Sequence, residues 1–72
     1  NLYNEYPVVQ ISSENEKNTQ NLESKVGKVL QDAKLNYKSI LVQEQGLEVV
    51  FTSTDTQLLA RDVIKNALGT QY

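Results

Sequence analysis

The 72-residue sequence predicts an α+β fold in which two helices cover one face of an antiparallel sheet. Two segments, residues 22–33 and 58–68, repeat their apolar side chains at the three- and four-residue spacing of an α-helix. Between them, residues 40–43 and 47–52 change to a spacing of two, which is typical of β-strands. A short apolar segment before the first helix supplies another strand.

The first strand is expected at Val8 to Ile11. Pro7 stands just before it, where a missing N–H costs least, and biases Tyr6 toward an extended conformation. The next segment, residues 12–17, contains only polar side chains. It lacks the glycine and the terminal carboxylate of a calcium-binding loop, so we expect a solvated loop.

The first helix is predicted to begin near Asn18, with Asn18 or Asn15 as its cap. Gly27 inside this helix costs about 1 kcal/mol relative to alanine, which favours a close-packing role for it. The apolar side chains of one face are Leu22, Val26, Val29, Leu30 and Ala33.

A β-hairpin is predicted next. Ile40 and Val42 alternate with their neighbours, and the same period of two returns at residues 47–52. The turn between the two strands is Glu44-Gln45-Gly46, where we expect Gly46 to supply the positive φ of a short loop.

The second helix is expected to start at Thr54. Thr54 and Gln57 have the spacing of a capping box, and Asp55 complements the helix dipole. Gly69 stands where a glycine closes a helix. The predicted apolar stripe is broad and contains Leu58, Leu59, Ala60, Val63, Ile64, Ala67 and Leu68.

The resulting order is that of a ferredoxin-like split β-α-β-β-α(-β), one small domain over residues 1–72. The complete plan needs a fourth strand after Gly69, beside the first strand. We expect this last strand to be truncated or short at Gln71-Tyr72, which leaves the edge of the first strand exposed.

Composition argues against catalysis and against several kinds of partner. The chain has no cysteine and no histidine, so thiolate metal sites, disulfides and the commonest general base are absent. We expect no enzyme activity, no cofactor and no metal. The net charge is −2 without a basic block, which excludes nucleic acid as an expected partner. No apolar run is long enough to span a membrane.

Two stretches resemble the SecD family of bacterial protein-export membrane subunits. The first is Asn1-Leu2-Tyr3 with Pro7 and Val9-Gln10-Ile11. The second runs over residues 53–58, Ser-Thr-Asp-Thr-Gln-Leu, and continues with Ala60-Arg61 and with Leu68-Gly69 before Tyr72. Residues 12–41 match only in pattern, and Asn4-Glu5-Tyr6 departs from the family.

The resemblance implies a soluble piece of a membrane-anchored protein. It corresponds to the N-terminal part of the first periplasmic region, after a first transmembrane helix, and the start at Asn1 fits such a piece. The family works with SecF and SecYEG on the periplasmic side of the inner membrane and moves unfolded preproteins with the proton motive force. The family's proton-relay residues lie in transmembrane helices, so no catalytic or ion-carrying role transfers to this chain.

A contact surface for unfolded chains is expected on the exposed sheet edge or on the sheet face opposite the helices. On that face we expect Val8, Leu41 and Val50. The alternative function is an independent ferredoxin-like small-ligand or regulatory binding domain. That alternative predicts a complete four-stranded sheet and a dimer formed through sheet edges.

Overall fold

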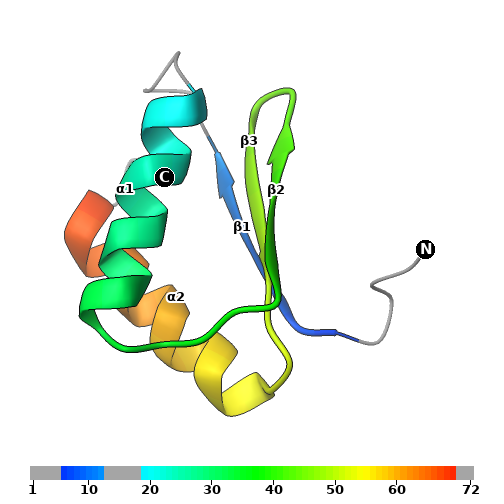
Figure 1. The fold of residues 1–72 in the computed structure, drawn as a ribbon, viewed down its shortest axis with the longest axis vertical. Helices are drawn as coiled ribbons and strands as arrows, with labels where there is room; N and C mark the ends of the chain where they lie inside the picture. The colour runs from blue at the N-terminus through cyan, green and yellow to red at the C-terminus, as the bar shows by residue number, and fades with distance from the viewer. Residues whose placement is uncertain (1–5, 13–18, 70–72) are drawn as a thin grey trace.

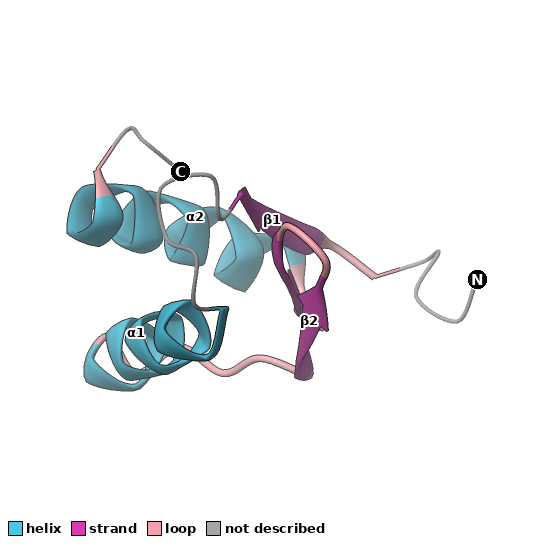
Figure 2. Cartoon of the chain, turned by 90° about the horizontal axis from the view of Figure 1, so that it is seen from above, coloured by secondary structure: helices cyan, strands magenta, loops and turns pink. Residues whose placement is uncertain are grey.

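The computed structural model describes residues 6–12 and 19–69 (Figure 1). Both helices lie on one face of the sheet, so the predicted α+β arrangement is confirmed (Figures 1 and 2). The elements are β1 (Val8–Ser12), α1 (Thr19–Asp32), β2 (Ser39–Gln43), β3 (Gly46–Val50) and α2 (Thr54–Leu68).

The sheet has the order β1-β3-β2, and β3 pairs antiparallel with both neighbours. β1 and β2 are therefore parallel to each other with β3 inserted between them. This is the split β-α-β unit of the ferredoxin-like plan. The expected fourth strand at Gln71-Tyr72 lies outside the described residues.

The hairpin is confirmed, but Gly46 has a different role from the predicted one. Gln43 pairs with Gly46, which leaves Glu44 and Gln45 as a two-residue loop. Gly46 does not have a positive φ. A Cβ at this position would instead overlap the carbonyl oxygen of Ile11 and lie 3.0 Å from its carbonyl carbon. Gly46 is needed because β1 approaches β3 closely here, where Ser12 pairs with it.

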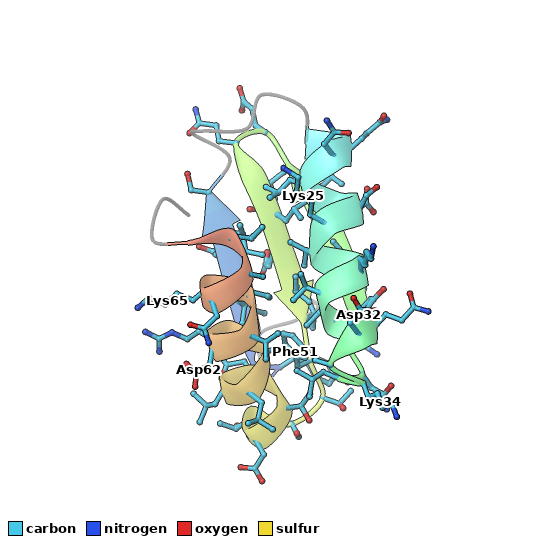
Figure 3. The ribbon with its side chains drawn as sticks, turned by 90° about the vertical axis from the view of Figure 1, so that its left-hand side faces the viewer. Lys25, Asp32, Lys34, Phe51, Asp62 and Lys65 are labelled. Carbon is cyan, nitrogen blue, oxygen red and sulfur yellow. The ribbon has the colours of Figure 1, made fainter. Side chains whose placement is uncertain are left out.

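The hydrophobic core fills the space between the sheet and the two helices. Phe51 is fully buried and lies between the helices, whereas Asp62 and Lys65 project from α2 away from the core (Figure 3). The other buried members are Val9, Ile11, Leu47 and Val49 from the sheet, Leu22, Val26 and Leu30 from α1, and Ala60 and Ile64 from α2.

The face of α1 that packs into the core is the apolar face predicted from the sequence. The prediction that Gly27 allows close packing is wrong. A Cβ on Gly27 would meet no atom within 4 Å. The expected caps Asn15 and Asn18 lie outside the described residues. At the other end, Lys34 adopts a left-handed φ of 59°, and its N–H donates to the carbonyl of Gln31 at 3.0 Å. The N–H of Leu35 donates to the carbonyl of Leu30 at 2.9 Å, which completes a Schellman motif.

The cap of α2 is Ser53, one residue before the predicted one. The Ser53 hydroxyl accepts the N–H of Thr56 at 3.1 Å and donates to the Thr56 hydroxyl at 3.0 Å. Asp55 does lie in the first turn, as predicted. Gly69 closes the helix with a φ of 84° and donates its N–H to the carbonyl of Lys65 at 2.8 Å.

The apolar stripe of α2 is narrower than its sequence suggests. Leu58 and Leu59 are 48% and 57% exposed, whereas Ala60 and Ile64 are buried. The prediction was too broad because helical spacing alone does not show how far round the helix the sheet and α1 reach.

Candidate functional site

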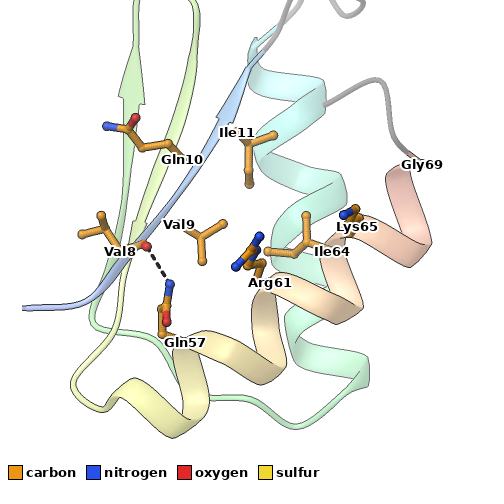
Figure 4. Close-up of a pocket in the computed structure, with 9 residues that line it drawn as sticks. All are labelled: Val8, Val9, Gln10, Ile11, Gln57, Arg61, Ile64, Lys65 and Gly69. Carbon is orange, nitrogen blue, oxygen red and sulfur yellow. Dashed lines mark hydrogen bonds between the residues drawn. The ribbon is translucent and has the colours of Figure 1, made fainter.

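An open groove runs between β1 and α2 and is the candidate functional site of the described chain. It encloses about 390 Å³ (Figure 4). One wall is formed by residues 8–11 of β1. The other wall is formed by residues from successive turns of α2 and its C-terminal glycine: Gln57, Arg61, Ile64, Lys65 and Gly69.

Gln57 ties the two walls of the groove together. Its side-chain Nε2 donates to the backbone carbonyl of Val8 at 3.0 Å, in a partly buried position (Figure 4). The sequence suggested Gln57 as the capping partner of Thr54, a role the structure does not show. Because the two partners are 49 residues apart, no local pattern indicates this hydrogen bond.

The second of the two stretches that resemble a known family, residues 53–58 with Ala60-Arg61, positions α2 in this part of the fold. Ser53 caps α2, Gln57 clamps β1, and Ala60 is buried against the core. Arg61 is exposed and lines the groove. The motif therefore places α2 against β1.

The groove follows an edge of β1 that carries main-chain hydrogen-bonding groups. The N–H of Phe51 donates to the carbonyl of Pro7 at 2.9 Å, which marks these residues as a hydrogen-bonded pair. Such pairs alternate along an antiparallel ladder, so Val9 and Ile11 also bond to β3. Val8 and Gln10 consequently direct their N–H and C=O groups toward the groove.

The sheet face opposite the helices holds the three residues of the predicted contact surface. Val8 and Leu41 are partly exposed, but Val50 is fully buried. Val50 pairs with Val8 on one side and with Ser39 on the other, whereas Leu41 pairs with Glu48. Val50 thus contributes no accessible area to this face.

A contact between Tyr6 and Lys38 crosses β3 near Val50. The Lys38 Nζ lies 5.0 Å from the centroid of the Tyr6 ring, a cation–π arrangement. Tyr6 precedes β1 and Lys38 precedes β2, and these strands flank β3. The contact thus spans the central strand, and nothing in the local pattern of either segment predicts it.

The described residues contain no cluster of three or more acidic side chains that could hold a metal ion. Within residues 6–12 and 19–69, neither helix has the length and apolar character needed to cross a membrane. The site therefore consists of a sheet edge, a groove with two cationic side chains, and a partly apolar sheet face.

Comparison with known proteins identifies the family. The family model described as "SecD export protein N-terminal TM region" matches residues 1–72. The chain is 43% identical to the protein translocase subunit SecD of Haemophilus influenzae over 74 residues. Its identity to the SecD proteins of Salmonella choleraesuis and Escherichia coli K12 is 37% and 36%, each over 73 residues.

Each of these matches covers 100% of the chain but only 12% of the relative. No solved structure matches the chain significantly. Since the family model and the relatives span its whole length, the chain belongs to the SecD family.

Proposed function

We propose that this chain is a non-catalytic module of a SecD subunit and assists the translocation of proteins by the bacterial export machinery. The observation that carries the proposal is the family match over all 72 residues. The relatives with this region are translocase subunits, and the chain spans about an eighth of their length, 12%. The module acts as part of a longer, membrane-anchored protein.

In this proposal the module works on the periplasmic side of the inner membrane, and its parent acts with SecF and SecYEG. The proton motive force drives the parent, whose proton-carrying groups lie outside this chain. The module supplies a surface rather than a reaction. A compact α+β unit suits this role because its sheet presents a face and an edge on the side away from the helices.

The proposed contact for a translocating chain is the sheet face with Val8 and Leu41, together with the adjoining edge of β2. β3 bonds to β1 through its odd-numbered residues, so its even-numbered residues bond to β2. Ile40 and Val42 therefore direct their main-chain groups to the outer edge of β2. The Val42 side chain is 51% exposed. An unfolded chain can add to such an edge through main-chain hydrogen bonds, which tolerate many sequences.

Site-specific photo-crosslinking in the full-length SecD protein tests this contact. A photoreactive amino acid replaces Leu41 in one variant and Leu59 in the control. Leu59 is an exposed leucine on α2, away from the sheet face. We expect a translocating preprotein to crosslink at position 41 and not at position 59. Equal crosslinking at both positions, or none at position 41, would contradict the proposed surface.

A titration of the isotopically labelled 72-residue chain with an unfolded export substrate adds an independent test. Amide shifts are expected along β2 and around Leu41. If no amide of the sheet shifts at millimolar substrate, direct binding of preprotein by this module is wrong. A translocation defect after deletion of the module would then indicate a scaffolding role within SecD.

A further inference from the structure

Val50 is fully buried on a sheet face that neither helix covers. Its neighbours Val49 and Phe51 belong to the core between the sheet and the helices, whereas Val50 does not. Because side chains alternate along a strand, Val50 points to the opposite face, away from α1 and α2 (Figures 1 and 2). A part of the chain other than the helices therefore covers Val50.

Tyr6 and Lys38 close over Val50 from the two sides of β3. Main-chain bonds hold both segments level with the end of this strand. The Lys38 N–H donates to the carbonyl of Val50 at 2.7 Å, and the carbonyl of Pro7 accepts the N–H of Phe51 at 2.9 Å. Tyr6 is in phase with the β1 residues that face away from the core, and its ring centroid lies 5.0 Å from the Lys38 Nζ. This contact bridges the end of β3 above Val50.

We propose that Tyr6 and Lys38 form a lid over Val50, and that the Tyr6 ring occupies the place that an aromatic side chain of a translocating chain takes when the lid opens. The inference deepens the proposed function, since it rests on the contact of that chain with the sheet face and the edge of β2. It adds Val50 to the contact as a residue that is hidden until the lid opens.

Two observations indicate that the lid is held weakly. Tyr6 is 38% exposed and Lys38 is also exposed, and a cation–π contact between solvated groups contributes little stability. The second observation concerns Ser39, which pairs with Val50 in the ladder. Its Oγ is buried and has no hydrogen-bond partner among the described residues. A buried hydroxyl without a partner is unfavourable, so access of solvent or of an incoming main-chain group to Ser39 favours opening.

Ser39 also makes Val50 reachable from the edge of β2. Ile40 packs against the core, so Ser39 points to the same open face as Val50. A segment that adds to the outer edge of β2 is therefore separated from Val50 only by the small side chain of Ser39. A large side chain of that segment can extend over Ser39 and pack on Val50, with Leu41 beside it.

The composition of the lid indicates why the occupant is aromatic. The Tyr6 ring combines an apolar surface, which covers Val50, with an electron-rich face, which attracts the Lys38 ammonium group. An aromatic ring of a translocating chain reproduces both interactions after Tyr6 withdraws, whereas a leucine supplies only the apolar surface. We therefore expect the open site to prefer aromatic to aliphatic side chains.

Thiol labelling measures the lid directly, because the chain contains no cysteine. Val50→Cys introduces one thiol under the lid, and Val49→Cys introduces one in the core as the matched control. We expect Tyr6→Ala to speed labelling at position 50 by about tenfold, through a local opening, and to leave position 49 unchanged. Tyr6→Phe retains the ring and should keep most of the protection. Equal acceleration at both positions would show that Tyr6 supports the whole fold, and would overturn the proposal.

Two short unfolded peptides that differ at one position, phenylalanine or leucine, test the occupant. Each is titrated into the isotopically labelled 72-residue chain, and its Kd is obtained from the amide shifts. The phenylalanine peptide should bind several-fold more tightly than the leucine peptide. Tyr6→Ala should tighten its binding by about tenfold, because no lid competes with it. Lys38→Met, which removes the charge and keeps a long side chain, should abolish the preference for phenylalanine.

The proposal is overturned if labelling at position 50 does not depend on Tyr6, or if the leucine peptide binds as tightly as the phenylalanine peptide. Weaker binding of the phenylalanine peptide to Tyr6→Ala also overturns it, because the ring would then be part of the contact rather than its competitor. The proposed function fails separately: crosslinking at Leu41 tests the contact with preprotein, whereas thiol labelling tests the lid without any substrate.

Discussion

Gly46→Ala is predicted to weaken the domain strongly through a contact between backbone atoms of two strands. The added Cβ would overlap the carbonyl oxygen of Ile11 and lie 3.0 Å from its carbonyl carbon and 3.2 Å from the Cα of Ser12. All three atoms belong to the main chain of β1, so no side-chain rotation can relieve the contact. β1 and β3 must separate at the end where Ser12 pairs with Gly46.

The expected cost of Gly46→Ala is about 2–3 kcal/mol, the upper range for overpacking a tightly packed site. A domain of this size has a free energy of unfolding of roughly 4–10 kcal/mol, so the loss is a large fraction of its stability. The corresponding fall in the thermal midpoint is about 10–20 °C. Urea denaturation followed by circular dichroism measures the change, with the m-value as a check that both chains unfold in the same way.

Gly27→Ala is the matched control, because the same methyl group is added at a site with no atom within 4 Å. It should stabilise the helix by about 1 kcal/mol through the better helix propensity of alanine. If Gly46→Ala lowers the free energy of unfolding by less than about 0.5 kcal/mol, as an ordinary surface substitution does, then the close approach of the β1 backbone is not what requires glycine at this position. The same conclusion follows if both substitutions change stability in the same direction.

Further substitutions test other features of the fold by the same denaturation assay. Ser53→Ala should lower the free energy of unfolding by about 1 kcal/mol because it removes the side-chain cap of α2, while Thr54→Ala should change it little. A larger loss with Thr54→Ala than with Ser53→Ala would support the predicted capping box instead. Lys34→Gly should stabilise α1 by up to about 1 kcal/mol, because Lys34 has a left-handed φ of 59°, which glycine adopts more easily. A loss of stability would contradict the assignment of Lys34 as the left-handed C-terminal residue of the helix. Ile64→Ala should lower the free energy of unfolding by about 2–4 kcal/mol, whereas Leu59→Ala should change it by no more than about 0.5 kcal/mol. Similar losses at both sites would show that the buried stripe of α2 is as broad as the sequence predicts.

The order of elements was predictable because each element has a local signature. Alternation at Ile40 and Val42 indicates a strand, and the spacing of Leu22, Val26 and Leu30 indicates a helix, without knowledge of what either packs against. The family was also predictable, since residues 53–58 form a local motif. These features depend on residues that are neighbours in the chain.

The candidate groove could not be predicted in the same way. The hydrogen bond between Gln57 and Val8 joins residues 49 positions apart. The predicted contact residue Val50 is fully buried, although its alternation places it on the face opposite the helices. Alternation shows on which face a side chain lies but not what lies above it.

The two internal glycines illustrate the division between sequence and tertiary structure most directly. The sequence marks Gly46 as a turn residue and Gly27 as a packing residue, because each role is common for a glycine in a hairpin or a helix. In the structure Gly46 has an ordinary φ and is required by the nearby backbone of β1, and Gly27 has open space beside it. Local periodicity determines which segments are strands and helices, because side-chain direction follows the backbone geometry of each element. The distances between elements are set only when the core packs, and those distances decide which residue is essential.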